Sequence, residues 1–377
     1  MLKKTGDLRV QPPLHAVLSA LTLVGVMLTG TWQMVVATQH LGRLEFASTW
    51  LDFRQGRTTA EVERHLDQAM PARKTLIAAA NSVRYLLTRG SDAQVRVGKD
   101  EWLFLTDELR FEPAGSRHLA ARAELFGAAA RALDQQGVKL IVALVPDKAR
   151  VYADRLSGAR YPEYNRLRYQ DALNALQLQG VQAVDLLKPL ILASAREEVY
   201  YRSDTHWNQA GAKVAAESIA LAVKGSGIEF EETLFITESA HIPVERPGDL
   251  IRLMGLDGSP DTLRPRPDRE TPVTTRQEAA VSAGGLFDDA AVQVVLTGTS
   301  YSLRGNFHGY VQQALSAKVL NTARDGGGLL QAPTSYLTND AFHSAKPKVL
   351  LWEVPERFLY AKLDGELTWL KKVGLGD

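Results

Sequence analysis

The pattern of apolar and polar residues divides the chain into an N-terminal helical part and a longer alternating part. Residues 14–38 contain no Asp, Glu, Lys or Arg and consist mostly of Leu, Val, Ala, Met and Gly. Residues 58–89 place apolar side chains at helical spacing on both sides of Pro71, which predicts two amphipathic helices separated at the proline. From residue 95 onwards, short β-branched runs alternate with helical patterns.

The part that begins at residue 95 predicts an α/β domain. A strand, a Gly-Lys-Asp turn and a second strand are expected over residues 95–105. Further on, near-continuous apolar runs are typical of parallel strands that are covered on both faces by helices. The expected helices cover residues 120–136, 165–179, 208–224 and 306–315, and the expected strands cover residues 138–145, 181–186, 292–296 and 348–352. Between residues 228 and 285 the pattern weakens, and the Arg- and Pro-rich run 263–270 predicts an exposed loop.

The uncharged segment 14–38 predicts a membrane anchor, because about 20 apolar residues suffice to cross a bilayer. The apolar region of a secretory signal is usually only about 7 to 15 residues long, which favours an uncleaved anchor. Cleavage after Val35-Val36-Ala37 and a buried core helix remain alternatives. Three basic residues and one acidic residue precede the span, so a cytoplasmic tail and an exported remainder are expected. The predicted organisation is a tail over residues 1–13, an anchor over 14–38, a helical stalk over 39–94 and a catalytic domain over 95–377.

Composition and charge narrow the classes of function. Of the 377 residues, 45% are hydrophobic and 23% are charged, as in ordinary globular proteins. The 44 Lys and Arg residues against 43 Asp and Glu give no overall field for a nucleic-acid backbone, so no nucleic-acid partner is expected. The sequence has no cysteine, which excludes disulfides, iron–sulfur clusters and thiol nucleophiles. It also lacks a His-Glu-x-x-His motif, a P-loop and a dinucleotide fingerprint, so neither a metal nor a cofactor is expected.

Two short segments carry side chains suited to acyl transfer. Asp204 and His206 lie two residues apart ahead of a predicted helix, so both can project to the same side of an extended loop. A carboxylate in that position fixes the imidazole tautomer, and the other ring nitrogen can then take a proton from a serine hydroxyl. Ser300 follows the predicted strand 292–296 in a Gly-Thr-Ser turn, at the edge where α/β sheets carry their chemistry. These residues predict a Ser-His-Asp triad, with a capped helix start and an ordinary turn as the alternatives.

An oxyanion hole would require N–H donors beside the serine. Backbone N–H groups from Gly298 to Tyr301 are candidates. Asn306 is a further candidate by proximity, but it equally fits the N-cap of the following helix. Arg202 and Arg304 adjoin the two segments, where they can contact an acidic sugar or be ordinary solvated or ion-paired side chains.

Five ordered blocks between residues 95 and 359 resemble the alginate O-acetyltransferases of the AlgJ and AlgX type, a periplasmic family of the SGNH hydrolase-like superfamily. The blocks are Val97–Phe104, Val145–Lys148, Ser203–Asn208, Gly298–Ser302 and Trp352–Arg357. The resemblance assigns Asp204 and His206 to the family's acid–base pair and Ser300 to its nucleophile, in an order permuted relative to ordinary SGNH esterases. It implies a three-layer SGNH hydrolase-like fold with a mostly parallel central sheet.

The same resemblance implies transfer of acetyl groups, through an acetyl-enzyme, to an exopolysaccharide such as alginate. The implied partners are a membrane-bound O-acyltransferase that supplies the acetyl group and other exopolysaccharide assembly proteins, with the catalytic domain in the periplasm and the anchor in the bacterial inner membrane. The chain ends 20 residues after Arg357, which leaves no room for the carbohydrate-binding module of AlgX-type proteins and favours the AlgJ type. A polysaccharide acetylesterase and an inactive scaffold of an assembly complex remain as alternative functions.

Overall fold

The computed structural model describes residues 24, 25, 27–32, 35, 36, 50–54, 57, 73–88, 93–158, 160–278 and 292–376. The chain divides into two compact units, Met1–Ala80 and Asn81–Asp377. The predicted anchor and the first predicted helix of the stalk lie largely outside the described residues. Among the residues that are described, no helix combines the length and the apolar character needed to cross a membrane. The short helix α2 (Trp50–Arg54) precedes α4 (Arg73–Thr88), which confirms the helix predicted after Pro71.

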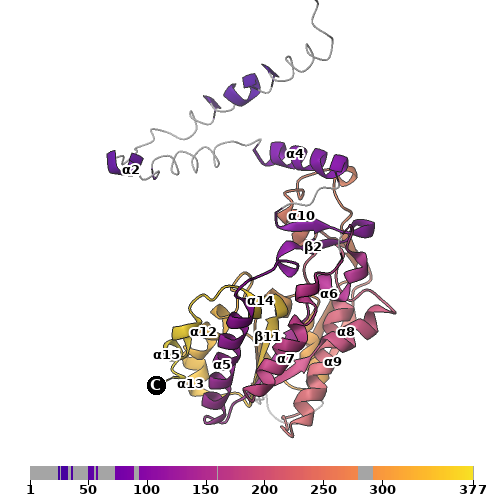
Figure 1. Cartoon of the computed structure of the whole chain (residues 1–377). Coiled ribbons are helices and arrows are strands. Elements are labelled where there is room, and N and C mark those ends of the chain that lie inside the picture. Colours follow the sequence, from indigo (N-terminus) through magenta and orange to yellow (C-terminus); the bar gives the residue numbers. More distant parts are fainter. Residues whose placement is uncertain are drawn as a thin grey trace, which may run out of the picture. The chain divides into compact units, whose positions relative to one another are not determined.

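A five-stranded parallel sheet lies at the centre of the larger unit (Figure 1). In sheet order its strands are β10 (Val319–Asn321), β9 (Val294–Thr297), β11 (Val349–Pro355), β3 (Lys139–Val145) and β4 (Gln182–Asp185). The central strand β11 pairs with β3 along its whole length, from Val349 opposite Lys139 to Pro355 opposite Val145. The four strands predicted for this sheet are confirmed. The fifth, β10, has only three residues, which is too short for a periodic pattern to reveal.

Helices cover both faces of the sheet, as the apolar strands predict. One layer contains α6 (Lys148–Val151), α8 (Leu187–Ser194), α9 (Gln209–Gly225) and α11 (Phe307–Leu315). The other layer contains α5 (Gly115–Asp134), α7 (Arg168–Leu178), α12 (Gln331–Leu337), α13 (Asp340–Ser344), α14 (Glu356–Tyr360) and α15 (Glu366–Lys372). Along β3, Ile141 and Val145 belong to the first core, and Leu140 and Leu144 belong to the second. Successive side chains of a strand point to opposite faces of the sheet, so β3 contributes to two separate hydrophobic cores.

Smaller elements lie outside the central sheet. The hairpin of β1 (Val95–Val97) and β2 (Leu103–Leu105), predicted from the sequence, packs with α10 (Asp249–Leu253) in a third core. The region with a weak pattern forms two antiparallel ribbons, β5 (Phe235–Ser239) with β8 (Val273–Gln277) and β6 (Val244–Arg246) with β7 (Asp268–Glu270). The prediction of a loop over residues 263–270 is wrong for its last three residues, which form β7. These three residues are all charged, and the partner strand rather than an apolar pattern fixes their conformation.

The segments that connect neighbouring strands in the two halves of the sheet cross opposite faces. The chain passes from β3 to the neighbouring β4 through α7 on one face, and from β9 to the neighbouring β10 through α11 on the other face. The strand β11 lies between β3 and β9, so the carboxyl ends of all three strands meet at one edge. Open α/β sheets bind ligands at such a switch point.

The central position of β11 predicts a large effect on stability when its apolar side chains are shortened. Leu351 on β11 is 0% exposed, and Leu351→Ala is expected to lower the free energy of unfolding by about 2 to 5 kcal/mol. Leu320 on the edge strand β10 is 41% exposed, and Leu320→Ala is expected to cost less than about 1 kcal/mol. Urea unfolding followed by tryptophan fluorescence measures both, and equal losses would contradict the central position of β11.

Candidate active site

The segment ahead of α9 forms a buried loop that presents two polar side chains. An isolated bridge between Tyr200 and Trp207 closes the loop. Asn208 caps α9 as predicted, since its side chain accepts a backbone N–H of the first turn at 3.0 Å. Within the loop, the side chains of Asp204 and His206 are only 7% and 6% exposed. Polar groups this deeply buried require hydrogen-bond partners.

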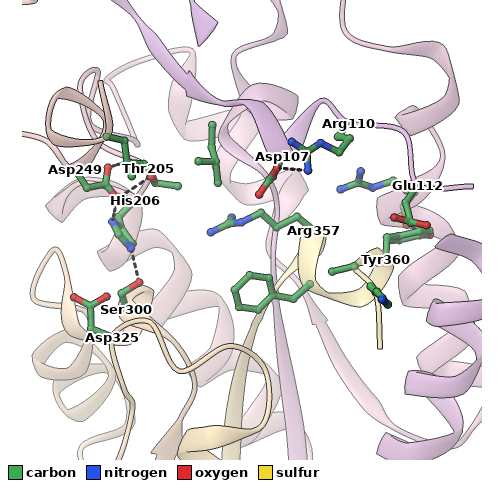
Figure 2. Close-up of a pocket in the computed structure, with 16 residues that line it drawn as sticks. Asp107, Arg110, Glu112, Thr205, His206, Asp249, Ser300, Asp325, Arg357 and Tyr360 are labelled. Carbon is green, nitrogen blue, oxygen red and sulfur yellow. Dashed lines mark hydrogen bonds and ion pairs between the residues drawn. The ribbon is translucent and has the colours of Figure 1, made fainter. Parts of the chain in front are cut away.

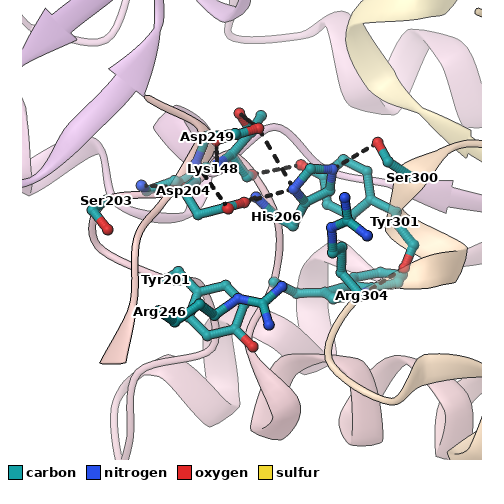
Figure 3. Close-up of polar contacts among 12 residues, drawn as sticks. Lys148, Tyr201, Ser203, Asp204, His206, Arg246, Asp249, Ser300, Tyr301 and Arg304 are labelled. Atoms are coloured by element: carbon teal, nitrogen blue, oxygen red, sulfur yellow. Dashed lines mark hydrogen bonds and ion pairs between the residues drawn. The ribbon is translucent and has the colours of Figure 1, made fainter. Parts of the chain in front are cut away.

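Asp204, His206 and Ser300 form an unbroken hydrogen-bonded chain (Figure 3). Nδ1 of His206 lies 2.6 Å from Oδ1 of Asp204, and Nε2 lies 2.7 Å from Oγ of Ser300. Because an ionised carboxylate can only accept, Nδ1 carries the ring hydrogen and Nε2 accepts from the serine hydroxyl. The structure therefore brings together the three side chains that the sequence predicts as a triad.

The surroundings of Asp204 keep its carboxyl group ionised. Burial alone raises the pKa of Asp204, but the hydrogen bond and positive charge of His206, together with backbone N–H groups, outweigh burial and hold the pKa well below its usual range. The backbone N–H groups of His206 and Asp249 each donate to the carboxylate at 3.0 Å. Asp204 is therefore a permanent acceptor for the imidazole at neutral pH.

A buried ammonium group supports the same loop. Nζ of Lys148 donates to the carbonyl oxygens of Leu103 at 2.6 Å, Arg202 at 2.9 Å and Asp204 at 2.9 Å. Burial lowers the pKa of Lys148 to about 8, so the charged form still predominates at neutral pH. All three ammonium donors are thus used to join β2 to the loop.

Asp268 of β7 holds the loop by a second set of hydrogen bonds. Its carboxylate accepts the backbone N–H of Arg202 at 2.8 Å, the N–H of Ser203 at 2.9 Å and the hydroxyl of Ser203. Asp268 lies in the run that the sequence predicts as an exposed loop, so no functional role is predicted for it. No pattern in the sequence links residue 268 to residue 203.

The turn that carries Ser300 is fixed by a carboxylate on the central strand. Gly298 has φ 155°, and a Cβ at this position would lie 2.7 Å from the carbonyl oxygen of Glu353, so the turn requires glycine. The backbone N–H of Thr299 donates to the Glu353 carboxylate at 2.8 Å, and the hydroxyl of Ser302 does so at 3.1 Å. Burial raises the pKa of Glu353, with these hydrogen bonds opposing it.

The predicted oxyanion donors do not meet beside Ser300. Gly298 packs against β11 and is not among the residues that line the cavity at Ser300. Asn306 has a left-handed φ of 57° and donates to Oγ1 of Thr275 at 2.8 Å, in a separate pocket. Asn306 does occupy the predicted N-cap position of α11, but its side chain makes no capping hydrogen bond there. Among the described residues, the backbone N–H of Ser300 has no acceptor and is free for an oxyanion.

The chain of hydrogen bonds ends at a cavity of about 480 Å³ (Figure 2). His206 and Ser300 lie at one end of the cavity, Arg110 and Glu112 lie at the other, and Arg357 lies between them. Its charged lining residues are Arg110, Arg168, Arg357, Lys362, Asp107, Glu112, Asp249 and Asp325. The lining also contains Leu105, Leu253, Phe358, Tyr360 and Ala361, and its exposed surface is more apolar than polar, so the cavity offers both apolar contact and charged groups to a ligand.

Arg357 belongs to a network of buried charges behind the cavity, and the sequence analysis gave it no role. The network consists of Arg150, Arg168, Arg357, Glu108, Asp147 and Glu356. Burial lowers the pKa of Arg357, but Tyr301, Asp147 and Glu108 outweigh burial and raise it, so the guanidinium stays charged. It lies 3.5 Å from the Asp147 carboxylate and 5.7 Å from the ring centroid of Tyr301.

Known proteins share this arrangement of segments. Residues 95–356 match the family model described as an SGNH hydrolase-like domain, acetyltransferase AlgX. A protein of Pseudomonas syringae pv. tomato, named probable alginate O-acetylase AlgJ, is 34% identical over 314 residues, which cover 82% of this chain and 80% of the relative. Its namesake from Pseudomonas putida is 35% identical over 314 residues, with 82% and 81% covered.

Two solved structures of related proteins have a similar fold. The O-acetyltransferase domain of Pseudomonas putida AlgJ matches with a TM-score of 0.66 and 35% identity, covering 74% of this chain and 98% of that domain. Pseudomonas aeruginosa AlgX matches with a TM-score of 0.57 and 23% identity, covering 74% of this chain and 66% of AlgX, which supports the fold alone. The SGNH-like fold predicted from the sequence is therefore confirmed, and the chain belongs to the family of SGNH hydrolase-like acetyltransferases that includes AlgX and AlgJ.

Proposed function

We propose that this protein transfers acetyl groups to hydroxyl groups of alginate or a similar exopolysaccharide, with Ser300 as nucleophile, His206 as general base and acid, and Asp204 as its orienting carboxylate. The observation that supports this most strongly is the hydrogen-bonded chain from Asp204 through His206 to Ser300 at one end of the cavity. The names of the AlgJ relatives support alginate as the polymer.

In the first half of the reaction, Oγ of Ser300 attacks the carbonyl carbon of an acetyl donor. Nε2 of His206 accepts the hydroxyl proton, and the imidazolium is stabilised by Asp204. The negative charge that develops on the carbonyl oxygen is stabilised by the free N–H of Ser300. Collapse of the tetrahedral intermediate leaves an acetyl ester on Ser300, and the departing group takes the proton from His206.

In the second half, a sugar hydroxyl attacks the acetyl ester. Nε2 of His206 takes the proton of that hydroxyl, and the tetrahedral intermediate again places its charge at the N–H of Ser300. When the bond to Oγ breaks, the proton returns to Ser300 and the acetyl group remains on the sugar. The enzyme is thereby regenerated with a free serine hydroxyl and a neutral imidazole.

The two alternative functions are less well supported. An acetylesterase would use water in the second half, whereas the relatives named alginate O-acetylase and the matching O-acetyltransferase domain favour transfer to a sugar hydroxyl. An inactive scaffold has no use for an imidazole hydrogen-bonded at 2.7 Å to a half-buried serine hydroxyl.

The proposal extends to partners and location. A membrane-bound O-acyltransferase would deliver the acetyl group, and other exopolysaccharide assembly proteins would present the polymer. The uncharged residues 14–38 and the basic residues before them support an anchor in the bacterial inner membrane, with the catalytic domain in the periplasm.

Ser300→Ala is expected to abolish both cleavage of a chromogenic acetyl ester and acetylation of alginate oligosaccharides, a loss of at least about 10³-fold. Thermal unfolding should change little, because the hydroxyl is half-buried and makes one hydrogen bond. Absorbance measures ester cleavage, and mass spectrometry of the oligosaccharides measures transfer.

Ser302→Ala is the matched control, because its hydroxyl binds Glu353 and does not contact His206. An active Ser300→Ala together with an inactive Ser302→Ala would move the nucleophile by two positions. Equal transfer to neutral cello-oligosaccharides would argue against alginate while leaving the triad intact.

Asp204→Asn is expected to lower turnover by about 10⁴-fold, because the amide keeps the shape of the carboxylate but stabilises the wrong imidazole tautomer. Asp134→Asn, an exposed change at the end of α5, provides the control and should leave turnover unchanged. Steady-state ester cleavage by the folded variants gives the comparison. Near-wild-type turnover of Asp204→Asn would remove Asp204 from the mechanism.

Membrane attachment is expected to depend on residues 14–38. After fractionation of cells, the protein should remain with the inner membrane, and protease added to the periplasmic side should digest residues beyond 43. A variant with Gly25→Arg should anchor less well, because arginine at the centre of a span costs about 2.5 to 3.5 kcal/mol. Recovery of a soluble mature protein that begins at Thr38 would instead indicate cleavage after Ala37.

A further inference from the structure

A second carboxylate lies beside the imidazole, on the side opposite Ser300 (Figure 3). Oδ2 of Asp249 is 3.7 Å from Nδ1 of His206, the same nitrogen that Asp204 contacts at 2.6 Å. We propose that Asp249 is a positioning residue that orients Asp204 and His206 and shares with Asp204 the stabilisation of the imidazolium in both halves of the reaction. This inference rests on the proposed function of the triad.

Hydrogen bonds tie Asp249 to the two residues that precede His206. Its backbone N–H donates to Oδ2 of Asp204 at 3.0 Å. Its carboxylate accepts the backbone N–H of Thr205 at 2.7 Å and the hydroxyl of Thr205 at 2.8 Å. These bonds hold the Asp204 carboxylate and the backbone just before His206 in fixed positions relative to Asp249.

The helix α10 gives Asp249 a rigid base. Asp249 is its first residue, and the next two, Leu250 and Ile251, are 0% exposed in the third core. A Cβ on the preceding Gly248 would overlap the carbonyl oxygen of Ser203, so only glycine allows α10 to approach the loop this closely. Packing and backbone contact thus fix the carboxylate in place independently of the imidazole.

The charges around Asp249 match this role. Burial raises the pKa of Asp249, and the negative charge of Asp204 raises it further, while the positive charge of His206 opposes both. A protonated imidazole therefore favours the ionised form of Asp249. The imidazole becomes protonated during acetyl transfer, so Asp249 is most strongly ionised at that stage.

Other charged or titratable groups lie around the imidazole or line the pocket beside it. From the elements packed around it and the adjoining pocket these are Tyr301, Glu353, Lys148, Arg246, Arg252, Asp257, Arg304 and Asp325. Within the described part of the chain, however, only Asp204 and Asp249 place a carboxylate oxygen within 4.0 Å of Nδ1. Removal of the charge at residue 249 should therefore alter the protonation of the imidazole directly.

The test is the pH profile of acetyl-ester cleavage by full-length Asp249→Asn, measured as kcat and KM from about pH 5 to pH 9. The amide can still accept from the N–H of Thr205, so the loop keeps that contact. We expect the plateau of kcat to fall between about 10-fold and 100-fold with little change in KM. The acid limb should move to lower pH by at least about half a unit, because the imidazolium loses a neighbouring negative charge.

Two controls separate charge from structure. Thr205→Val removes one hydrogen bond to Asp249 without changing any charge, so it should lower the plateau and leave the acid limb in place. Asp257→Asn removes a carboxylate of the adjoining pocket that does not contact the ring, and its acid limb should also stay in place. Circular dichroism checks folding, and Asp249→Ser is the second charge-removing variant if the asparagine variant does not fold.

The outcomes distinguish this inference from the proposed function. An acid limb that does not move in a folded variant without the charge, or wild-type kcat in that variant, overturns the role of Asp249 and leaves the triad standing. Activity in Ser300→Ala would instead overturn the proposed function itself. A shift of the limb by Thr205→Val as large as that by Asp249→Asn would assign the effect to the loop contact and overturn the electrostatic role.

Discussion

Two buried ionisable side chains, Lys148 and Glu353, hold the candidate active site together. Burying an ionisable group costs free energy unless hydrogen bonds compensate for the lost water. Both side chains form such bonds with backbone or hydroxyl groups of the two segments that carry the triad. Lys148 binds the carbonyl oxygens of the loop around Asp204, and Glu353 binds the N–H and hydroxyl groups of the turn around Ser300. Each half of the triad is thus held by the hydrogen bonds of one buried ionisable side chain, and Asp249 and Asp268 add further bonds to the half that carries Asp204.

The sheet fixes where these two side chains lie relative to each other. Lys148 follows the end of β3, Glu353 lies within β11, and the two strands pair in parallel with Glu353 opposite Ala143. A slip of one residue in this register would turn Glu353 to the other face of the sheet and remove it from the Ser300 turn. Because both faces are covered by close-packed cores, such a slip would also misplace every apolar side chain of β11. The 2.7 Å contact between His206 and Ser300 therefore depends on the strand register.

Local patterns were sufficient for much of the fold and for the triad. The length and continuity of the apolar runs in β3 and β11 predict strands that are buried on both faces, and both strands are buried along nearly their whole length. Asp204 and His206 are close in the sequence, so their contact is a local event, and Ser300 was found because its glycine-bearing turn ends an apolar strand. In each case the signal lies within a few residues.

Only the tertiary structure decided what surrounds the triad. Asp249 and Asp268 reach the loop from segments about 45 to 65 residues away in the chain, without any periodic pattern, because hydrogen bonds of single side chains leave no trace in hydrophobic spacing. Asn306 is near Ser300 in the sequence, yet a left-handed backbone directs its amide to Thr275 instead. The sequence alone determined which residues can do acyl-transfer chemistry and which strands form the core, because these depend on residue type and local spacing. The orientation and charge of the site depend on contacts between distant segments, and these exist only once the chain has folded.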